Sequence, residues 1–109
     1  MRRLLWAAVL VAGCGGGAPP ACEALAPGLE RDRCFAARLL TLPATDLPLC
    51  VATAEQIADP LVRGEAVITW ANTHNRELQP PAGQELCALL SRLDQGTCQR
   101  RLMTPHLQR

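Results

Sequence analysis

The stretch that decides the predicted fold is Asp59–His74, which reads DPLVRGEAVITWANTH. Asp59 followed by Pro60 is a strong signal for a helix start, because the carboxylate caps free backbone N–H groups and proline fits the first turn. Apolar residues then recur at helical spacing on one face, namely Leu61, Gly64, Val67, Ile68 and Ala71, widened by Ala66 and Trp70. The opposite face carries Glu65, Thr69, Asn72 and Thr73. This pattern predicts an amphipathic helix that ends at about His74.

Two further helices are predicted before this one. The first covers residues 29–42 and ends at Pro43. Its apolar positions are Leu29, Ala36, Leu39 and Leu40, flanked by Phe35 and Leu42. The second begins at Thr45 or Asp46, and Pro48 lies in its first turn, where proline is tolerated. Its apolar stripe consists of Leu47, Cys50, Val51, Ala54 and Ile57.

A fourth helix is predicted near the C-terminus, after a loop rich in Asn, Pro and Gly over residues 72–83. It runs from about Gln84 to Leu93. Its apolar stripe consists of Leu86, Leu89, Leu90 and Leu93. Gly96 suits a left-handed helix stop, so residues 97–103 are expected to form only a short turn before a polar tail. No run alternates with a period of two residues, so the predicted fold is all-α, a small bundle of about four helices over residues 21–109.

The N-terminus has the form of an export signal. Met1-Arg2-Arg3 is a short basic start, Leu4–Val11 is apolar, and the run ends at Val11-Ala12-Gly13-Cys14. Such a layout is typical of a secretory signal, and the apolar run is far shorter than the ~20 residues of a membrane-spanning helix. The last four residues resemble the lipobox of bacterial lipoproteins with a type II signal peptide.

This resemblance implies cleavage before Cys14, a diacylglyceryl thioether on its sulfur and acylation of the new amino group. Residues 1–13 are then the signal peptide, and residues 14–20 are the lipidated cysteine with a flexible tether. Gly15 stands where enteric lipoproteins of the inner membrane have Asp, so the resemblance implies the outer membrane, facing the periplasm. The expected partners are the membrane, through the lipid on Cys14, and a further envelope protein of unknown identity.

Composition excludes some functions. The formal net charge is +1, which gives no electrostatic basis for a nucleic-acid partner. Aromatic residues make up 3% of the chain, which disfavours sugar-binding clefts, single-strand nucleic-acid grooves and protein interaction hot spots, because all three depend on aromatic faces. The predicted function is a non-enzymatic interaction or structural module of the cell envelope.

Five cysteines follow the lipobox, namely Cys22, Cys34, Cys50, Cys87 and Cys98. Cysteines of a small exported domain usually pair, and a core of this size benefits from such staples. Cys87 precedes Gly96 and Cys98 follows it, so a fold-back of the chain is expected to join these two cysteines.

The other pairing stays open at this point. Cys34 and Cys50 each lie eight residues from Leu42, so antiparallel helices would bring them to the same height. Cys34 lies away from the centre of its apolar stripe, which makes a Cys22–Cys34 bridge the alternative. We expect Cys34–Cys50, with Cys22 free or joined to a second molecule.

No catalytic residue, metal site or cofactor is predicted, because no hydrolase, zinc-protease or phosphate-loop motif occurs. The alternative function is a small periplasmic enzyme or metal-binding protein that uses His74 or His106 with cysteines. Zinc on Cys87, Cys98 and His106 would lack the close cysteine pairs of zinc sites. A weak binding site is predicted at Trp70, His74 and Arg76, although helix ends collect polar residues in any case.

Overall fold

The computed structural model describes residues 21–107. Its elements are, in order, η1 (Cys22–Ala24), α2 (Leu29–Leu40), η2 (Ala44–Asp46), α3 (Leu47–Glu55), α4 (Pro60–His74), α5 (Pro80–Cys87) and α6 (Arg92–Leu107), where η is a 3-10 turn. No strand occurs among these residues, so the all-α prediction is confirmed. The described part of the chain contains five α-helices where about four were predicted.

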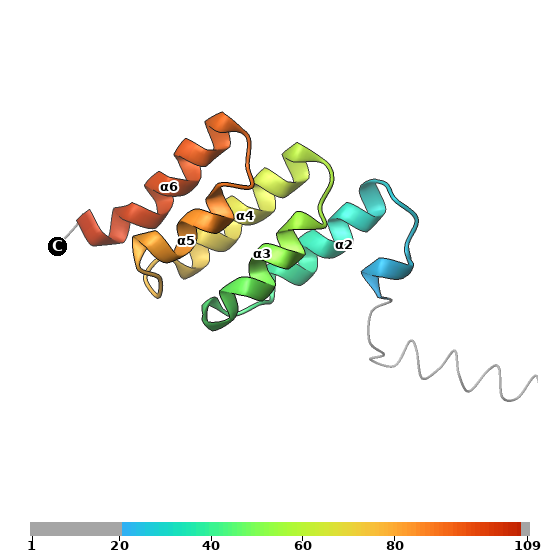
Figure 1. Ribbon diagram of the computed structural model, residues 1–109, viewed down its shortest axis with the longest axis horizontal. Helices are drawn as coiled ribbons and strands as arrows, with labels where there is room; N and C mark the ends of the chain where they lie inside the picture. Colours follow the sequence, from blue (N-terminus) through green and yellow to red (C-terminus); the bar gives the residue numbers. More distant parts are fainter. Residues whose placement is uncertain (1–20, 108–109) are drawn as a thin grey trace, which may run out of the picture.

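The helices form two layers (Figure 1). α2, α4 and α6 lie side by side and run in the same direction, and we call them the long layer. α3 and α5 pack against each other and run in the opposite direction, and we call them the short layer. Each short-layer helix also packs on neighbouring long-layer helices. The domain is therefore a stack of antiparallel helical hairpins.

Equivalent positions of successive hairpins are separated by the same number of residues along the sequence, and we call this separation the hairpin interval. It separates Leu29 from Leu61 and Leu61 from Leu93, and each of these is the first or second residue of a long-layer helix. The same interval separates Pro48 from Pro80, and each proline lies in the first turn of a short-layer helix. Repeated hairpin units, each contacting its neighbours, are the building plan of helical solenoid proteins. The described residues hold two such units followed by one further long-layer helix.

The core lies between the two layers and is centred on α4. Trp70 is fully buried, and its indole Nε1 donates a 2.9 Å hydrogen bond to the carbonyl oxygen of Leu42. The other large, fully buried apolar side chains are Phe35, Leu39, Ile57, Val67 and Leu86. Asp59 caps α4 as predicted, because its side chain accepts a hydrogen bond from the N–H of Val62. The predicted helix over residues 59–74 is thus confirmed.

The C-terminal prediction is wrong. The helix expected from Gln84 to Leu93 is interrupted at residues 88–91, and α6 continues through Gly96, where a stop was expected. Two prolines at 80 and 81 begin α5 within the expected loop, since the first helical turn needs no proline N–H. The interruption is stabilised by Gln95, whose Nε2 donates to the carbonyls of Leu90 at 2.8 Å and Ala88 at 3.3 Å.

Three leucines assigned to apolar faces are exposed in the structure. The exposed fraction is 51% for Leu29, 80% for Leu61 and 86% for Leu93. Helical spacing alone misplaces these side chains, each of which is the first or second residue of its helix.

Within residues 21–107, no single helix has both the length and the apolar composition to cross a membrane. A bent pair, Leu29–Leu40 with Ala44–Glu55, meets the two criteria jointly, with an angle of 116° between its halves.

The layer model predicts different responses of two leucines to truncation. Leu39 is fully buried, so Leu39→Ala should lower the free energy of unfolding by about 2–5 kcal/mol. Leu49 on α3 is 45% exposed, so Leu49→Ala should change it by less than about 1 kcal/mol. Urea unfolding of the oxidised protein measures both values, and similar losses for the two variants would contradict the packing described here.

Candidate functional site

The C-terminal disulfide joins Cys87 to Cys98, as predicted. Their Cα atoms are 5.6 Å apart, and the bond ties the end of α5 to the middle of α6. It closes the chain reversal at residues 88–91. The predicted partners are right, although the turn that brings them together is not at Gly96.

The second predicted disulfide, Cys34–Cys50, is wrong. Cys34 is bonded to Cys22, with the Cα atoms 5.6 Å apart, and Cys50 is the free cysteine of the described residues. The physical reason is the direction of the side chains. Cys50 is fully buried, and its thiol points to the carbonyl oxygen of Pro43 at 3.6 Å, whereas Cys34 meets the η1 turn that lies along α2.

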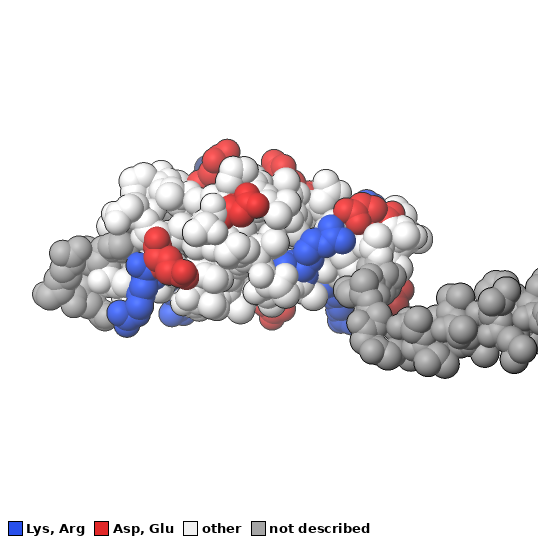
Figure 2. Space-filling view, turned by 90° about the horizontal axis from the view of Figure 1, so that it is seen from below, with Lys and Arg blue, Asp and Glu red and all other residues white. Residues whose placement is uncertain are grey.

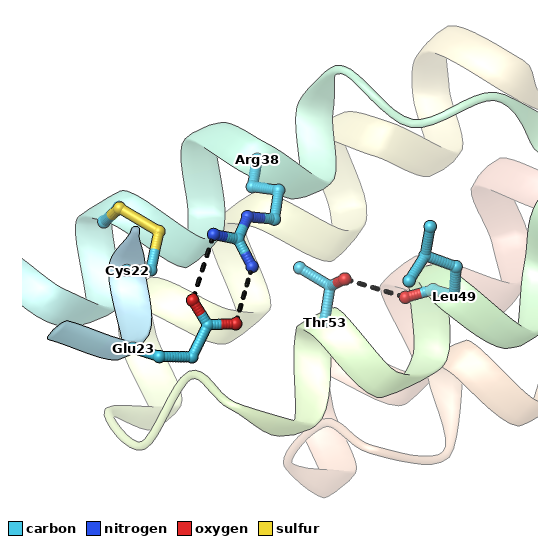
Figure 3. A network of polar contacts seen from close by, with 6 residues as sticks. Cys22, Glu23, Arg38, Leu49 and Thr53 are labelled. Atoms are coloured by element: carbon cyan, nitrogen blue, oxygen red, sulfur yellow. Dashed lines mark hydrogen bonds and ion pairs between the residues drawn. A yellow bond between two sulfur atoms is a disulfide. The ribbon is translucent and has the colours of Figure 1, made fainter. Parts of the chain in front are cut away.

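An ion pair supports the same contact between η1 and α2 (Figure 3). The guanidinium of Arg38 donates to both carboxylate oxygens of Glu23, at 3.0 and 3.3 Å, close to the disulfide at Cys22. The hydrogen bond from Arg38 lowers the pKa of Glu23. The pair is exposed, so it contributes little to stability and mainly fixes the direction of η1.

The metal-binding alternative loses two of its ligands. Cys87 and Cys98 are bonded to each other, so neither sulfur is available as a thiolate ligand. Among residues 21–107, no three His, Cys, Asp or Glu side chains lie close enough together to hold a metal ion.

Trp70 and His74 are occupied by structural contacts. Trp70 is fully buried, so its indole is not available at the surface. The His74 ring lies 4.6 Å from the Trp70 ring, and its Nδ1 is 2.7 Å from the carboxylate of Glu77. Arg76 is exposed in the turn after α4. A binding role for His74 and Arg76 stays a prediction.

Polar side chains secure the edge where the long-layer helices begin. We call this edge the loop rim; it comprises the N-terminal ends of α2, α4 and α6 with residues 56–59 and 88–91. Asp32 is 5% exposed, and its two carboxylate oxygens accept hydrogen bonds from the N–H groups of Ala58 at 3.0 Å and Asp59 at 3.1 Å. A buried carboxylate thus satisfies the backbone of the first loop.

Arg63 connects the two loops of this rim. Its guanidinium donates to the carbonyl oxygens of Ile57 at 2.9 Å and Leu89 at 3.0 Å. Those two carbonyls are themselves separated by one hairpin interval. Gln95, one hairpin interval after Arg63, binds the carbonyls of the second loop. This network was not among the sequence-based predictions, and the sequence signal for it is the repeat of donor side chains at positions 63 and 95.

The outer face of the long layer carries two shallow grooves, one on each side of α4. The groove toward α6 has a volume of about 370 Å³ and is lined by Leu61, Gly64, Ile68 and Asp94. The groove toward α2 has a volume of about 440 Å³ and includes Arg33, Ala37, Leu40 and Thr69. Val62 and Glu65 line both, so the two grooves form one open surface across three helices.

Charged side chains are dispersed on the face that is seen when the domain is viewed from below relative to Figure 1. Figure 2 shows basic and acidic side chains spread among neutral ones, in places next to each other, with no concentration of either sign on this face.

Comparison of the chain with protein-family models, with curated proteins and with solved structures finds no match. Cys14, the predicted lipidation site, lies outside the described residues.

The loop rim predicts a specific effect at Asp32. Asp32→Asn replaces one acceptor oxygen by an amide NH₂ group that faces a backbone donor, so it should lower the free energy of unfolding by about 1–3 kcal/mol. Glu30→Gln, an exposed acid-to-amide change on the same helix, is the matched control and should have little effect. Thermal and urea unfolding compare them, and equal values would remove the structural role given to Asp32.

The cysteine assignment predicts the reactivity of Cys50. Burial, followed by the nearby Asp46 carboxylate, raises the pKa of this thiol, so at pH 8 it has less reactive thiolate than an ordinary cysteine. In the Cys14→Ser background we expect one thiol, which iodoacetamide modifies slowly in the folded protein and rapidly in denaturant. Cys50→Ala should abolish the signal. Modification of Cys22 or Cys34 in the oxidised protein would contradict the observed pairing.

Proposed function

We propose that this chain is a lipid-anchored protein of the bacterial cell envelope, whose helical domain binds another envelope component and catalyses no reaction. The observation that carries the proposal is the sequence Val11-Ala12-Gly13-Cys14, which follows a basic start and a short apolar run. In this proposal Cys14 carries the lipid and residues 15–20 connect it to the domain.

The two disulfides support export. Disulfides form and persist in oxidising compartments such as the bacterial periplasm and are rare in the cytoplasm. A domain that contains the disulfides Cys22–Cys34 and Cys87–Cys98 is therefore consistent with a chain that folds after it has crossed the inner membrane.

The hydrogen bonds of the polar side chains support a binding role rather than a catalytic one. Asp32, Arg63 and Trp70 all direct their polar atoms to backbone groups of the domain itself. The grooves beside α4 are open and lined by apolar and scattered charged side chains, which is more typical of a contact surface than of a catalytic cleft.

The anchor is tested at Cys14. Cells grown with a tagged fatty acid should label the wild-type protein, whereas Cys14→Ser should lose the label and retain residues 1–13, which mass spectrometry detects. Cys50→Ala is the control, because it also removes one thiol but lies outside the lipobox-like stretch. Equal labelling of the wild type and Cys14→Ser would refute the lipid anchor.

The location is tested at Gly15. In an enteric host the wild-type protein should fractionate with the outer membrane, and Gly15→Asp should move it to the inner membrane. Gly17→Asp places the same charge two residues further along the tether and should leave the location unchanged. Wild-type protein found only in the inner membrane would contradict the proposed location.

A further inference from the structure

Three equivalent leucines stand exposed along the loop rim. Leu29, Leu61 and Leu93, which we call the leucine row, have 51%, 80% and 86% of their surface accessible. They occupy the same position in successive hairpin intervals, at the start of α2, α4 and α6. Those three helices run in the same direction side by side, so their first residues lie along one edge of the domain (Figure 1).

The row is a defined apolar feature of that edge. Packed helices lie about 8–10 Å apart, so three successive leucines extend over roughly 20 Å. Single exposed leucines are common on protein surfaces, but three of them at equivalent positions along one edge can contact the same apolar surface together.

The area of the row argues against a protein partner as its main occupant. A stable interface buries ~800 Å² on each side, far more than three leucine side chains offer. A membrane surface requires less, because a covalent lipid already supplies the affinity and the protein residues only have to orient the domain.

The N-terminal attachment allows the row to reach the bilayer. The disulfide holds Cys22 with its Cα 5.6 Å from that of Cys34, and Leu29 lies five residues before Cys34, about 7.5 Å along the helix. Residues 14–20 span at most about 25 Å when fully extended. A lipid on Cys14 therefore leaves the leucine row within reach of the membrane surface.

We propose that the leucine row inserts into the interfacial region of the bilayer in which the lipid on Cys14 is embedded, so that the long-layer helices stand with their first residues toward the membrane. This inference rests on the proposed lipid anchor. Apolar side chains of interfacial segments enter the bilayer by about 5–10 Å, a depth that a leucine at a helix tip reaches.

The charges beside the row indicate which lipid chemistry it meets. Glu30 follows Leu29, and Arg92 and Asp94 flank Leu93, so both signs are present. The attraction is therefore to the acyl chains, and it should be equal in zwitterionic and anionic vesicles.

Tryptophan placed in the row tests the proposal. The acylated Leu61→Trp protein is reconstituted into phosphatidylcholine vesicles with and without bromine on the acyl chains. The matched control is Leu49→Trp, an exposed leucine on α3 in the short layer, near the opposite edge. Buried Trp70 contributes the same background to both. An inserted indole should lose about half of its added emission in brominated vesicles, and the control should lose none.

Several results would overturn the inference. Equal quenching of Leu61→Trp and Leu49→Trp would show no preferred edge, and quenching that requires anionic lipid would contradict apolar insertion. Absence of quenching together with a concentration-dependent blue shift would assign the row to a second copy of the chain. The same shift caused only by envelope extract would assign it to a protein partner.

A second variant separates a failed insertion from a failed anchor. Mass spectrometry of each sample reports acylation of Cys14, so an acylated protein without quenching refutes the leucine row alone, and an unacylated protein refutes the anchor. With Leu29→Ser and Leu93→Ser added, the quenching of Leu61→Trp should fall at least twofold, while acylation and the melting temperature stay unchanged. Undiminished quenching would show that the three leucines do not act as a row.

Discussion

The packing of α4 between α2 and α6 is the constraint on which the rest of the structure depends. Three helices that run in the same direction must be joined by return segments, and the backbone of those segments needs hydrogen-bond partners. Asp32 and Arg63 supply them for the first return, while Arg63 and Gln95 supply them for the second. These few side chains satisfy the backbone of the return segments and so allow the long layer to form. The core around Trp70 then packs between the long layer and the short layer.

The two disulfides lie at opposite ends of this stack. Cys34 in α2 and Cys98 in α6 occupy equivalent positions, two hairpin intervals apart, and the middle unit has Ala66 there. In a stack of hairpins each unit is held by its neighbours, so the end units have fewer contacts than the middle one. The disulfides thus lie in the end units, which have the fewest packing contacts. The equivalent residue of the middle unit, Ala66, is buried on α4 and needs no disulfide.

Local signals predicted the first three helices and the cap at Asp59, because proline, capping residues and helical spacing act within one turn. The C-terminal third could not be predicted in this way. Glycine is typical of a helix end, so the sequence predicted that a helix would end at Gly96. Instead, the side chain of Gln95 hydrogen-bonds the chain reversal that precedes α6, and α6 continues past Gly96. The partner of Cys34 could not be predicted from helical spacing, because it lies on η1, a short turn without a periodic apolar pattern. The hairpin interval was detectable in the equal spacing of Leu29, Leu61 and Leu93, although few other equivalent positions share a residue type.

Because the disulfides lie at both ends of the stack, the stability of the domain depends on whether they form before or after export. If the chain is exported as proposed, its cysteines are reduced in the cytoplasm, and both end units are then held by packing alone. The precursor would be least stable while it waits for a translocation channel that accepts unfolded chains. On the far side, a periplasmic thiol oxidant would accept two electrons for each disulfide formed, and closure of both ends would stabilise the folded domain after its passage through the membrane.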